Sequence, residues 1–98
     1  MPKAYWVQTY RSSAKNTEAW EAYRKLAAPA LTAAGGRYLV RNKPAKTYEA
    51  GINERVILIE FESLEKAIAA HSAPAYQEAL RVLGAGNVER DIRLVEGE

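Results

Sequence analysis

The sequence predicts an α+β fold of the ferredoxin-like type, in which two helices cover one face of a four-stranded antiparallel sheet. Four short segments are rich in strand-forming residues, and two longer segments repeat apolar residues every three or four positions, as helices do. From Ala4 to Val95 these segments follow the order βαββαβ, which packs both helices on the same face. A chain of 98 residues has room for one hydrophobic core, so we expect a single domain over residues 1–98.

The first strand and the first helix are predicted from composition and helix-end signals. Residues 4–11 are aromatic and β-branched, which favours a strand. Asn16 can cap a helix by accepting a hydrogen bond from a first-turn amide, and the glycines at 35–36 end it because glycine adopts the left-handed conformation readily. Pro29 removes one helical amide, so we expect a kink or a 3₁₀ turn there. The predicted buried stripe comprises Ala19, Trp20, Tyr23, Ala27, Ala30, Leu31 and Ala34.

Residues 37–43 and 54–61 are predicted to form a strand hairpin. The second of these strands is apolar on both faces, which favours a central place in the sheet. The connecting loop, 44–53, is the longest in the chain and the strongest candidate for a mobile element. Matching apolar positions across the hairpin places Tyr38 and Val40 on the helix-covered face. The opposite face then receives Arg37, Leu39, Arg41, Val56, Leu58 and Glu60.

The second helical segment contains a predicted break. Ser63 can cap its start, and residues 72–74 (Ser-Ala-Pro) indicate an interruption followed by a restart, with Ser72 as the new cap and proline in the first turn. Glycines at 84 and 86 close the helix, and residues 88–95 alternate as the last strand.

This topology leaves the second face of the sheet uncovered. That face carries several apolar side chains, and monomers rarely expose so large an apolar patch to water. We therefore expect a homodimer in which a second copy of the chain covers it.

Composition excludes several classes of partner and chemistry. The net charge is +2, and although residues 1–50 hold nine Lys/Arg against three Glu, these cations are scattered, which argues against a nucleic-acid partner. No apolar run approaches the roughly 18 residues of a membrane span. The absence of cysteine excludes disulfides and thiolate chemistry, and residues 1–11 show no secretory pattern, so a cytoplasmic location is expected.

Four blocks of the sequence carry a resemblance to a known family. The blocks are GGRYLVR at 35–41, RVILIEFESLE at 55–65, SAPAYQ at 72–77 and LVEG at 94–97. In this order they resemble the family known as domain of unknown function 1330. The resemblance implies a dimeric α+β barrel, in which two ferredoxin-like sheets pack face to face, and a family without an established activity. Where the family usually has Tyr-Asp-Ser-Pro-Glu-Tyr, this chain has His-Ser-Ala-Pro-Ala-Tyr at 71–76, so Ala73 and Ala75 replace two polar positions.

Glu60 is the first candidate catalytic residue, as the only acid within the central strand. The predicted register places Arg37 directly across the hairpin from it, with Arg41 four residues further along the same strand. One interpretation is a structural ion pair within the barrel. The other makes Glu60 a general acid or base, with Arg37 or Arg41 binding an anionic group of the substrate.

His71 is the only histidine, and its pKa range suits proton transfer near neutral pH. Its place at the end of a helical turn is equally compatible with a favourable interaction with the helix dipole. A single histidine excludes a site with two imidazole ligands, while one haem-ligating histidine stays open. Trp6, Tyr48 and Tyr76 are candidate substrate-binding aromatics, with Tyr48 as a loop gate, and the alternative is that they belong to the core or an interface.

No Walker, Rossmann, HExxH or Gly-x-Ser-x-Gly motif is present, so neither a cofactor nor a metal is expected. Two functions fit these observations. The first is a cofactor-independent enzyme (isomerase, lyase or monooxygenase-like) that acts on a small, partly apolar or anionic molecule, by analogy with what this fold houses. The second is a non-catalytic module for small-molecule binding or dimeric interaction. A cavity that contains an unpaired acid or imidazole favours the enzyme, and mutual pairing of Arg37, Arg41 and Glu60 favours the module.

Overall fold

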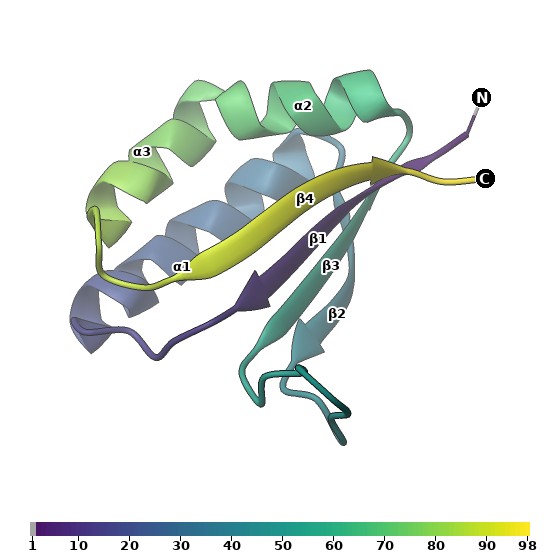
Figure 1. The fold of residues 1–98 in the computed structure, drawn as a ribbon. Coiled ribbons are helices and arrows are strands. Elements are labelled where there is room, and N and C mark those ends of the chain that lie inside the picture. The colour runs from purple at the N-terminus through teal and green to yellow at the C-terminus, as the bar shows by residue number, and fades with distance from the viewer. Residues whose placement is uncertain (1) are drawn as a thin grey trace.

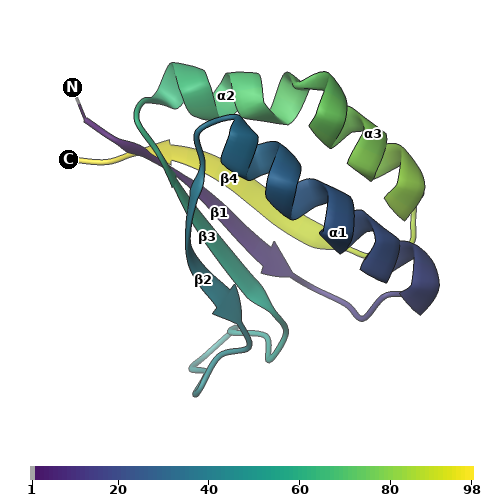
Figure 2. The ribbon, with the colours of Figure 1, turned by 180° about the vertical axis from the view of Figure 1, so that it is seen from behind.

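A computed structural model describes residues 2–98 as a four-stranded antiparallel sheet with its helices on one face (Figure 1). The strand order across the sheet is β2-β3-β1-β4, and the helices lie over one side only (Figure 2). The predicted α+β, ferredoxin-like class is confirmed. The elements are β1 (Ala4–Tyr10), α1 (Thr17–Ala33), β2 (Arg37–Asn42), β3 (Val56–Phe61), α2 (Leu64–Ser72), α3 (Pro74–Leu83) and β4 (Arg90–Glu96).

Helix α1 begins and ends where the sequence predicts. The Asn16 side chain accepts a hydrogen bond from the Ala19 amide at 3.0 Å, and Gly35 takes a φ of +100° just beyond the last turn. The predicted 3₁₀ turn at Pro29 is wrong, because α1 continues through it as α-helix. Pro29 is exposed, so water can reach the Lys25 carbonyl that loses its amide partner.

The predicted break between α2 and α3 is present, but its cap differs from the prediction. Helix α2 extends through Ser72, so that residue is helical and does not cap α3. Ala73 is the capping residue instead, in extended conformation and without a side-chain hydrogen bond, and Pro74 opens the new helix. A proline at this position lacks the amide that would need a cap, which reduces the need for a polar side chain. The Ser63 cap of α2 is confirmed, since its hydroxyl accepts from the Lys66 amide at 3.2 Å.

A β-bulge in β2 changes which face of the sheet its residues occupy. Arg37 pairs with Glu60 and Tyr38 with Ile59, as predicted, but the register then shifts across Leu39. One extra residue reverses the alternation of side chains beyond it. Val40 therefore pairs with Leu58 on the uncovered face, and Arg41 pairs with Ile57 on the helix side. The predicted placements of Val40 in the core and Arg41 on the uncovered face are both wrong for this reason.

The core fills the space between the sheet and the helices. Trp6 and Tyr76 are fully buried and meet edge to face, with ring centroids 5.3 Å apart. The next largest fully buried side chains are those of Phe61, Leu31 and Ile59.

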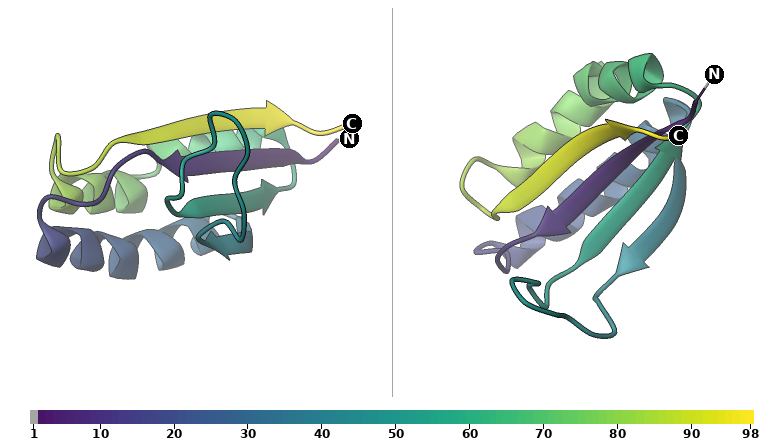
Figure 3. Two further views of the ribbon diagram at one scale, coloured as in Figure 1. Left: turned by 60° about the horizontal axis from the view of Figure 1, so that its bottom comes forward. Right: turned by 45° about the vertical axis from the view of Figure 1, so that its right-hand side comes forward.

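The opposite side of the sheet, here called the open sheet face, is not covered by any helix of residues 2–98 (Figure 3). Strand register assigns to it Tyr5, Val7, Thr9, Arg37, Val40, Asn42, Val56, Leu58, Glu60, Asp91, Arg93 and Val95. Within residues 2–98, no helix is long and apolar enough to cross a membrane.

Candidate functional site

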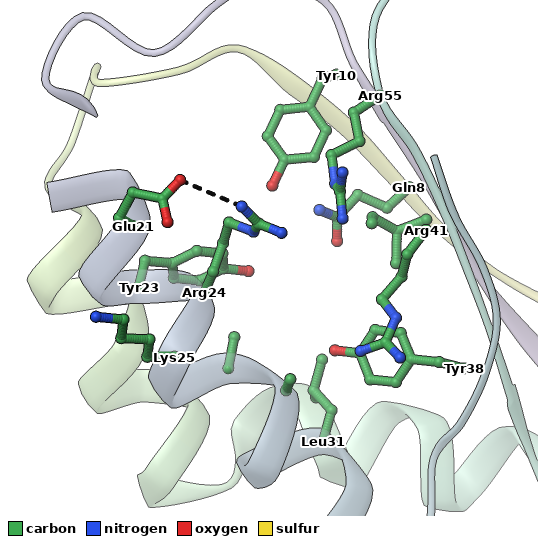
Figure 4. A pocket seen from close by; sticks show the side chains of 13 residues that line it. Gln8, Tyr10, Glu21, Tyr23, Arg24, Lys25, Leu31, Tyr38, Arg41 and Arg55 are labelled. Carbon is green, nitrogen blue, oxygen red and sulfur yellow. Dashed lines mark hydrogen bonds and ion pairs between the residues drawn. The ribbon is translucent and has the colours of Figure 1, made fainter. Parts of the chain in front are cut away.

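A cavity of about 270 Å³ lies between α1 and the sheet (Figure 4). It forms because α1 turns the small side chains of Ala27 and Ala28 toward this space, so that the helix does not fill it. We call it the inner pocket. Its lining residues are Gln8, Tyr10, Glu21, Tyr23, Arg24, Lys25, Ala27, Ala28, Leu31, Tyr38, Arg41, Arg55 and Ile57.

The charged residues around the inner pocket are mostly cationic. Glu21 is the one carboxylate in the lining, and its Oε1 lies 3.2 Å from Arg24 Nη1. Arg41 and Arg55 form no ion pair with any carboxylate of residues 2–98. Burial, reinforced by the positive charges of Arg24 and Arg41, lowers the pKa of Arg55. The pocket therefore holds positive charge that the described chain does not neutralise.

The rings of Tyr10, Tyr23 and Tyr38 line the inner pocket, and their hydroxyls point into it (Figure 4). Burial raises the pKa of Tyr38 to about 12 and raises the pKa of Tyr23 further. Both side chains are thus neutral phenols at physiological pH and act as hydrogen-bonding groups, not as bases. The Arg41 guanidinium lies over the Tyr38 ring, 4.4 Å from its centroid, which fixes the orientation of this cation.

The deepest polar groups of the pocket are held from behind by hydrogen bonds. Gln8 is 3% exposed, and its Oε1 accepts from the Trp6 indole at 2.8 Å. The Tyr23 hydroxyl accepts from Arg90 at 2.8 Å and lies 3.0 Å from the Tyr76 hydroxyl. The predicted aromatics Trp6 and Tyr76 therefore lie one layer behind the lining.

Glu60 and Arg37 lie on the open sheet face, away from the inner pocket. Their ion pair spans 3.7 Å, Lys3 Nζ lies 3.6 Å from the same carboxylate, and the Tyr5 hydroxyl donates to it at 3.2 Å. Arg41 is not part of this cluster, because the bulge directs it to the other face. Glu60 is thus fully supplied with partners.

The remaining predicted residues do not line the inner pocket. His71 lies in the last turn of α2, where its ring packs against Trp6 and Tyr76 with centroids 5.6 and 5.3 Å away. Tyr48 is 74% exposed on the 43–55 loop, near Lys46. Among residues 2–98, no cluster of His, Cys, Asp and Glu has the arrangement of a metal site.

Sequence reasoning missed several lining residues of the pocket, including Gln8 and Arg55. One signal was available: Gln8 is an amide at a position that alternation assigns to the buried face of the first strand. Arg55 precedes β3 and is held there because its carbonyl accepts a hydrogen bond from the Tyr10 amide at 2.9 Å.

A second cavity, of about 290 Å³, adjoins the inner pocket and shares Tyr10 and Arg55 with it. Its other lining residues are Ser12, Ser13, Ala14, Thr17, Trp20, Lys43 and Glu54. The two cavities thus meet at one tyrosine and one arginine.

Residues 3–98 match the family model described as Domain of unknown function (DUF1330). The chain belongs to this family. The resemblance found in the sequence is thereby confirmed over nearly its whole length. None of the curated proteins with which the chain was compared matches it.

Several solved structures share the fold of this DUF1330 protein. A protein of unknown function from Rhodopseudomonas palustris aligns with a TM-score of 0.73 at 16% identity, over 99% of this chain and 83% of that one. A NIPSNAP family protein of unknown function from Agrobacterium tumefaciens gives 0.56 at 22%, over 98% and 88%. SnoaB, a cofactor-independent oxygenase from Streptomyces nogalater, gives 0.61 at 11%, over 100% and 95%. At such low identities, the likeness shows the fold.

Proposed function

We propose that the inner pocket binds a small organic anion. The observation that carries this proposal is the set of cations around one half-open space, of which Arg41 and Arg55 have no carboxylate partner among residues 2–98. Neighbouring guanidinium groups repel one another in a partly buried site, and an anion between them relieves this repulsion. Arginine also binds carboxylates through two parallel hydrogen bonds.

The body of the proposed ligand is planar and aromatic or conjugated. Tyr10, Tyr23 and Tyr38 supply ring faces and edges, and Leu31 and Ile57 supply apolar contacts. The volume of about 270 Å³ lies just below the range of roughly 300–1,000 Å³ usual for drug-sized ligands, which suits a molecule of one or two rings.

Isothermal titration calorimetry with benzoate and naphthoate, each compared with its uncharged amide, tests this proposal. We expect the carboxylates to bind and the amides to bind about tenfold more weakly or worse, a difference of about 1.4 kcal/mol. Arg41→Gln and Arg55→Gln should each remove most of that difference. Arg81→Gln is the matched control, because Arg81 pairs with Glu78 on the exposed surface of α3 and does not line the pocket. Equal affinity for acids and amides would contradict the proposal.

A cofactor-independent oxygenase activity is a second candidate, supported by the fold shared with SnoaB. The pocket cations would stabilise a phenolate, which can give electrons to O₂ directly. In the balanced reaction, a phenol and O₂ yield a para-quinone and water: one oxygen atom forms the new carbon–oxygen bond, and the other leaves as water. Glu21 is the one carboxylate of the lining that can accept the phenol proton.

Oxygen consumption with hydroxybenzoates and hydroxynaphthoates as probes tests this second candidate. Uptake above the rate without protein, with the quinone formed in equal amount, would support it. Tight binding without oxygen uptake would reject the oxygenase while leaving the anion-binding proposal intact.

We propose further that two copies of the chain associate through the open sheet face. Leu39, Val40 and Val95 are between 39% and 48% exposed at or beside this face, and no helix of residues 2–98 covers it. Light scattering at micromolar concentration should give twice the 10.9 kDa chain mass, and Leu58→Lys should halve it. A wild-type chain that stays monomeric across that range would contradict the dimer.

A further inference from the structure

We infer that the wall of the inner pocket formed by Gln8 and Tyr23 presents hydrogen-bond donors to the cavity and no acceptors. The ligand must therefore present a hydrogen-bond acceptor to this wall. Gln8 and Tyr23 form this wall, and both line the cavity (Figure 4). The ligand class is then an acid with a second acceptor, such as a carbonyl oxygen, in place of an amino or other donor group. This inference rests on the proposed binding of an organic anion. It specifies in addition that the end of the ligand away from the acid group carries a hydrogen-bond acceptor.

The orientation of the Gln8 amide follows from the residue behind it. The Trp6 indole has a single N–H and no acceptor, and it is fully buried, so it needs an acceptor nearby. That acceptor is Gln8 Oε1, at 2.8 Å. Turning the amide over would place its NH₂ against the indole N–H, donor against donor. Gln8 therefore directs its carbonyl oxygen toward Trp6, which leaves its NH₂ to donate toward the cavity.

The proton of the Tyr23 hydroxyl is assigned by the same reasoning. Arg90 can only donate, so Tyr23 accepts from it, at 2.8 Å. The Tyr76 hydroxyl is fully buried, and Tyr23 is the one hydrogen-bond acceptor that it has among residues 2–98, at 3.0 Å. If Tyr23 donated to Tyr76, the proton of Tyr76 would be buried without an acceptor, which is costly.

Tyr76 therefore donates, and both lone pairs of the Tyr23 oxygen are occupied. The remaining proton of Tyr23 is free for an acceptor in the cavity.

A third lining group repeats the arrangement at the mouth of the second cavity. The Tyr10 hydroxyl accepts from the Trp20 indole at 3.2 Å, so its own proton is also free. Tyr10, Gln8 and Tyr23 are thus each backed by a residue that can only donate. This common pattern leaves each of the three groups with a proton to donate toward the ligand.

Three ligands of equal charge test the inference: 4-formylbenzoate offers an acceptor, 4-methylbenzoate neither, and 4-aminobenzoate a donor. Calorimetry on the wild-type protein should give affinities in that order, with about tenfold or more between the formyl and amino compounds. Trp6→Phe keeps an aromatic ring but removes the indole N–H, so the Gln8 side-chain amide can rotate by half a turn. The ratio of the affinities for 4-formylbenzoate and 4-aminobenzoate should then fall by about threefold or more. Tyr76→Phe should lower the ratio for the same reason at Tyr23.

Phe61→Leu is the control for core disturbance, because Phe61 packs near Trp6 without a side-chain hydrogen bond. It should lower thermal stability and leave the ratio unchanged. Equal binding of the three benzoates by the wild type, or an unchanged ratio in both Trp6→Phe and Tyr76→Phe, would overturn the inference while anion binding stands. Failure of all three benzoates to bind would overturn the proposed function and this inference together.

Discussion

The two faces of the sheet differ in whether their charged residues have partners of opposite charge. On the open sheet face, Glu60 has Lys3, Arg37 and Tyr5 around it. On the helix side, Arg41 and Arg55 line a cavity without a carboxylate partner among residues 2–98. Glu60, the one acid within a central strand, already has its partners on the same face. The charged groups that remain available for a ligand are Arg41 and Arg55, which have no such partner in the described part of the chain.

Reversing the charge of Arg41 in the inner pocket should have the largest effect on ligand binding. Arg41→Glu places a carboxylate in the inner pocket, and we expect 4-formylbenzoate to bind about a hundredfold more weakly, or about 2.8 kcal/mol, because the ligand's carboxylate then meets a like charge. Calorimetry measures this loss, and circular dichroism confirms that the variant is folded. Arg81→Glu, away from the pocket, should bind as the wild type does, and similar losses in both variants would refute the assignment of the site.

The folding stability of the protein should fall at high pH because tyrosines on the helix side of the sheet are buried. The pKa of Tyr38 is raised by burial to about 12, so between about pH 10, where an ordinary tyrosine ionises, and pH 12 the unfolded chain loses a proton that the folded chain keeps. This contribution to stability is complete below pH 10 and is lost as the pH rises through that window.

Melting temperatures measured from pH 9 to 12 should therefore fall, and Tyr38→Phe should make the fall shallower. Tyr48→Phe, at an exposed loop position, should follow the wild-type curve. A Tyr38→Phe profile parallel to that of the wild type would remove the buried phenol from the explanation.

The smallest effect is expected on the open sheet face. In the monomeric Leu58→Lys background, Glu60→Gln keeps the shape of the side chain but loses the attraction to Arg37, whose side chain is 75% exposed in the single chain, and such pairs contribute about 0–1 kcal/mol. Chemical denaturation should show a change within that range, and ligand affinity should not move. A loss of ligand binding in Glu60→Gln would show that this carboxylate belongs to the ligand site.

The sequence predicts most of the fold because its patterns are local. Strand alternation, the Asn16 and Ser63 caps and the glycine stops each depend on a few neighbouring residues, and hairpin matching also gives the Arg37–Glu60 register correctly. The pocket is harder to predict because one bulge at Leu39 reverses the phase of β2, and periodicity alone does not reveal where an extra residue is inserted.

The candidate site shows the same limit. Arg41 was assigned a binding role and does line the pocket, although it reaches the helix side through the bulge. Gln8 and Tyr23 come from successive elements, β1 and α1, and their donor character depends on Trp6 and Arg90 behind them. Such side-chain hydrogen bonds leave no periodic trace in a sequence.

The position of Arg55 between the two cavities bears on ligand length. Its side chain and that of Tyr10 are the lining shared by both spaces. Rotation of an arginine about its own bonds requires no movement of strands or helices. In the proposed binding mode, a longer ligand would extend toward Trp20 and the serines at 12–13 once the Arg55 side chain turns, so that a rotamer and not the backbone sets the greatest ligand length.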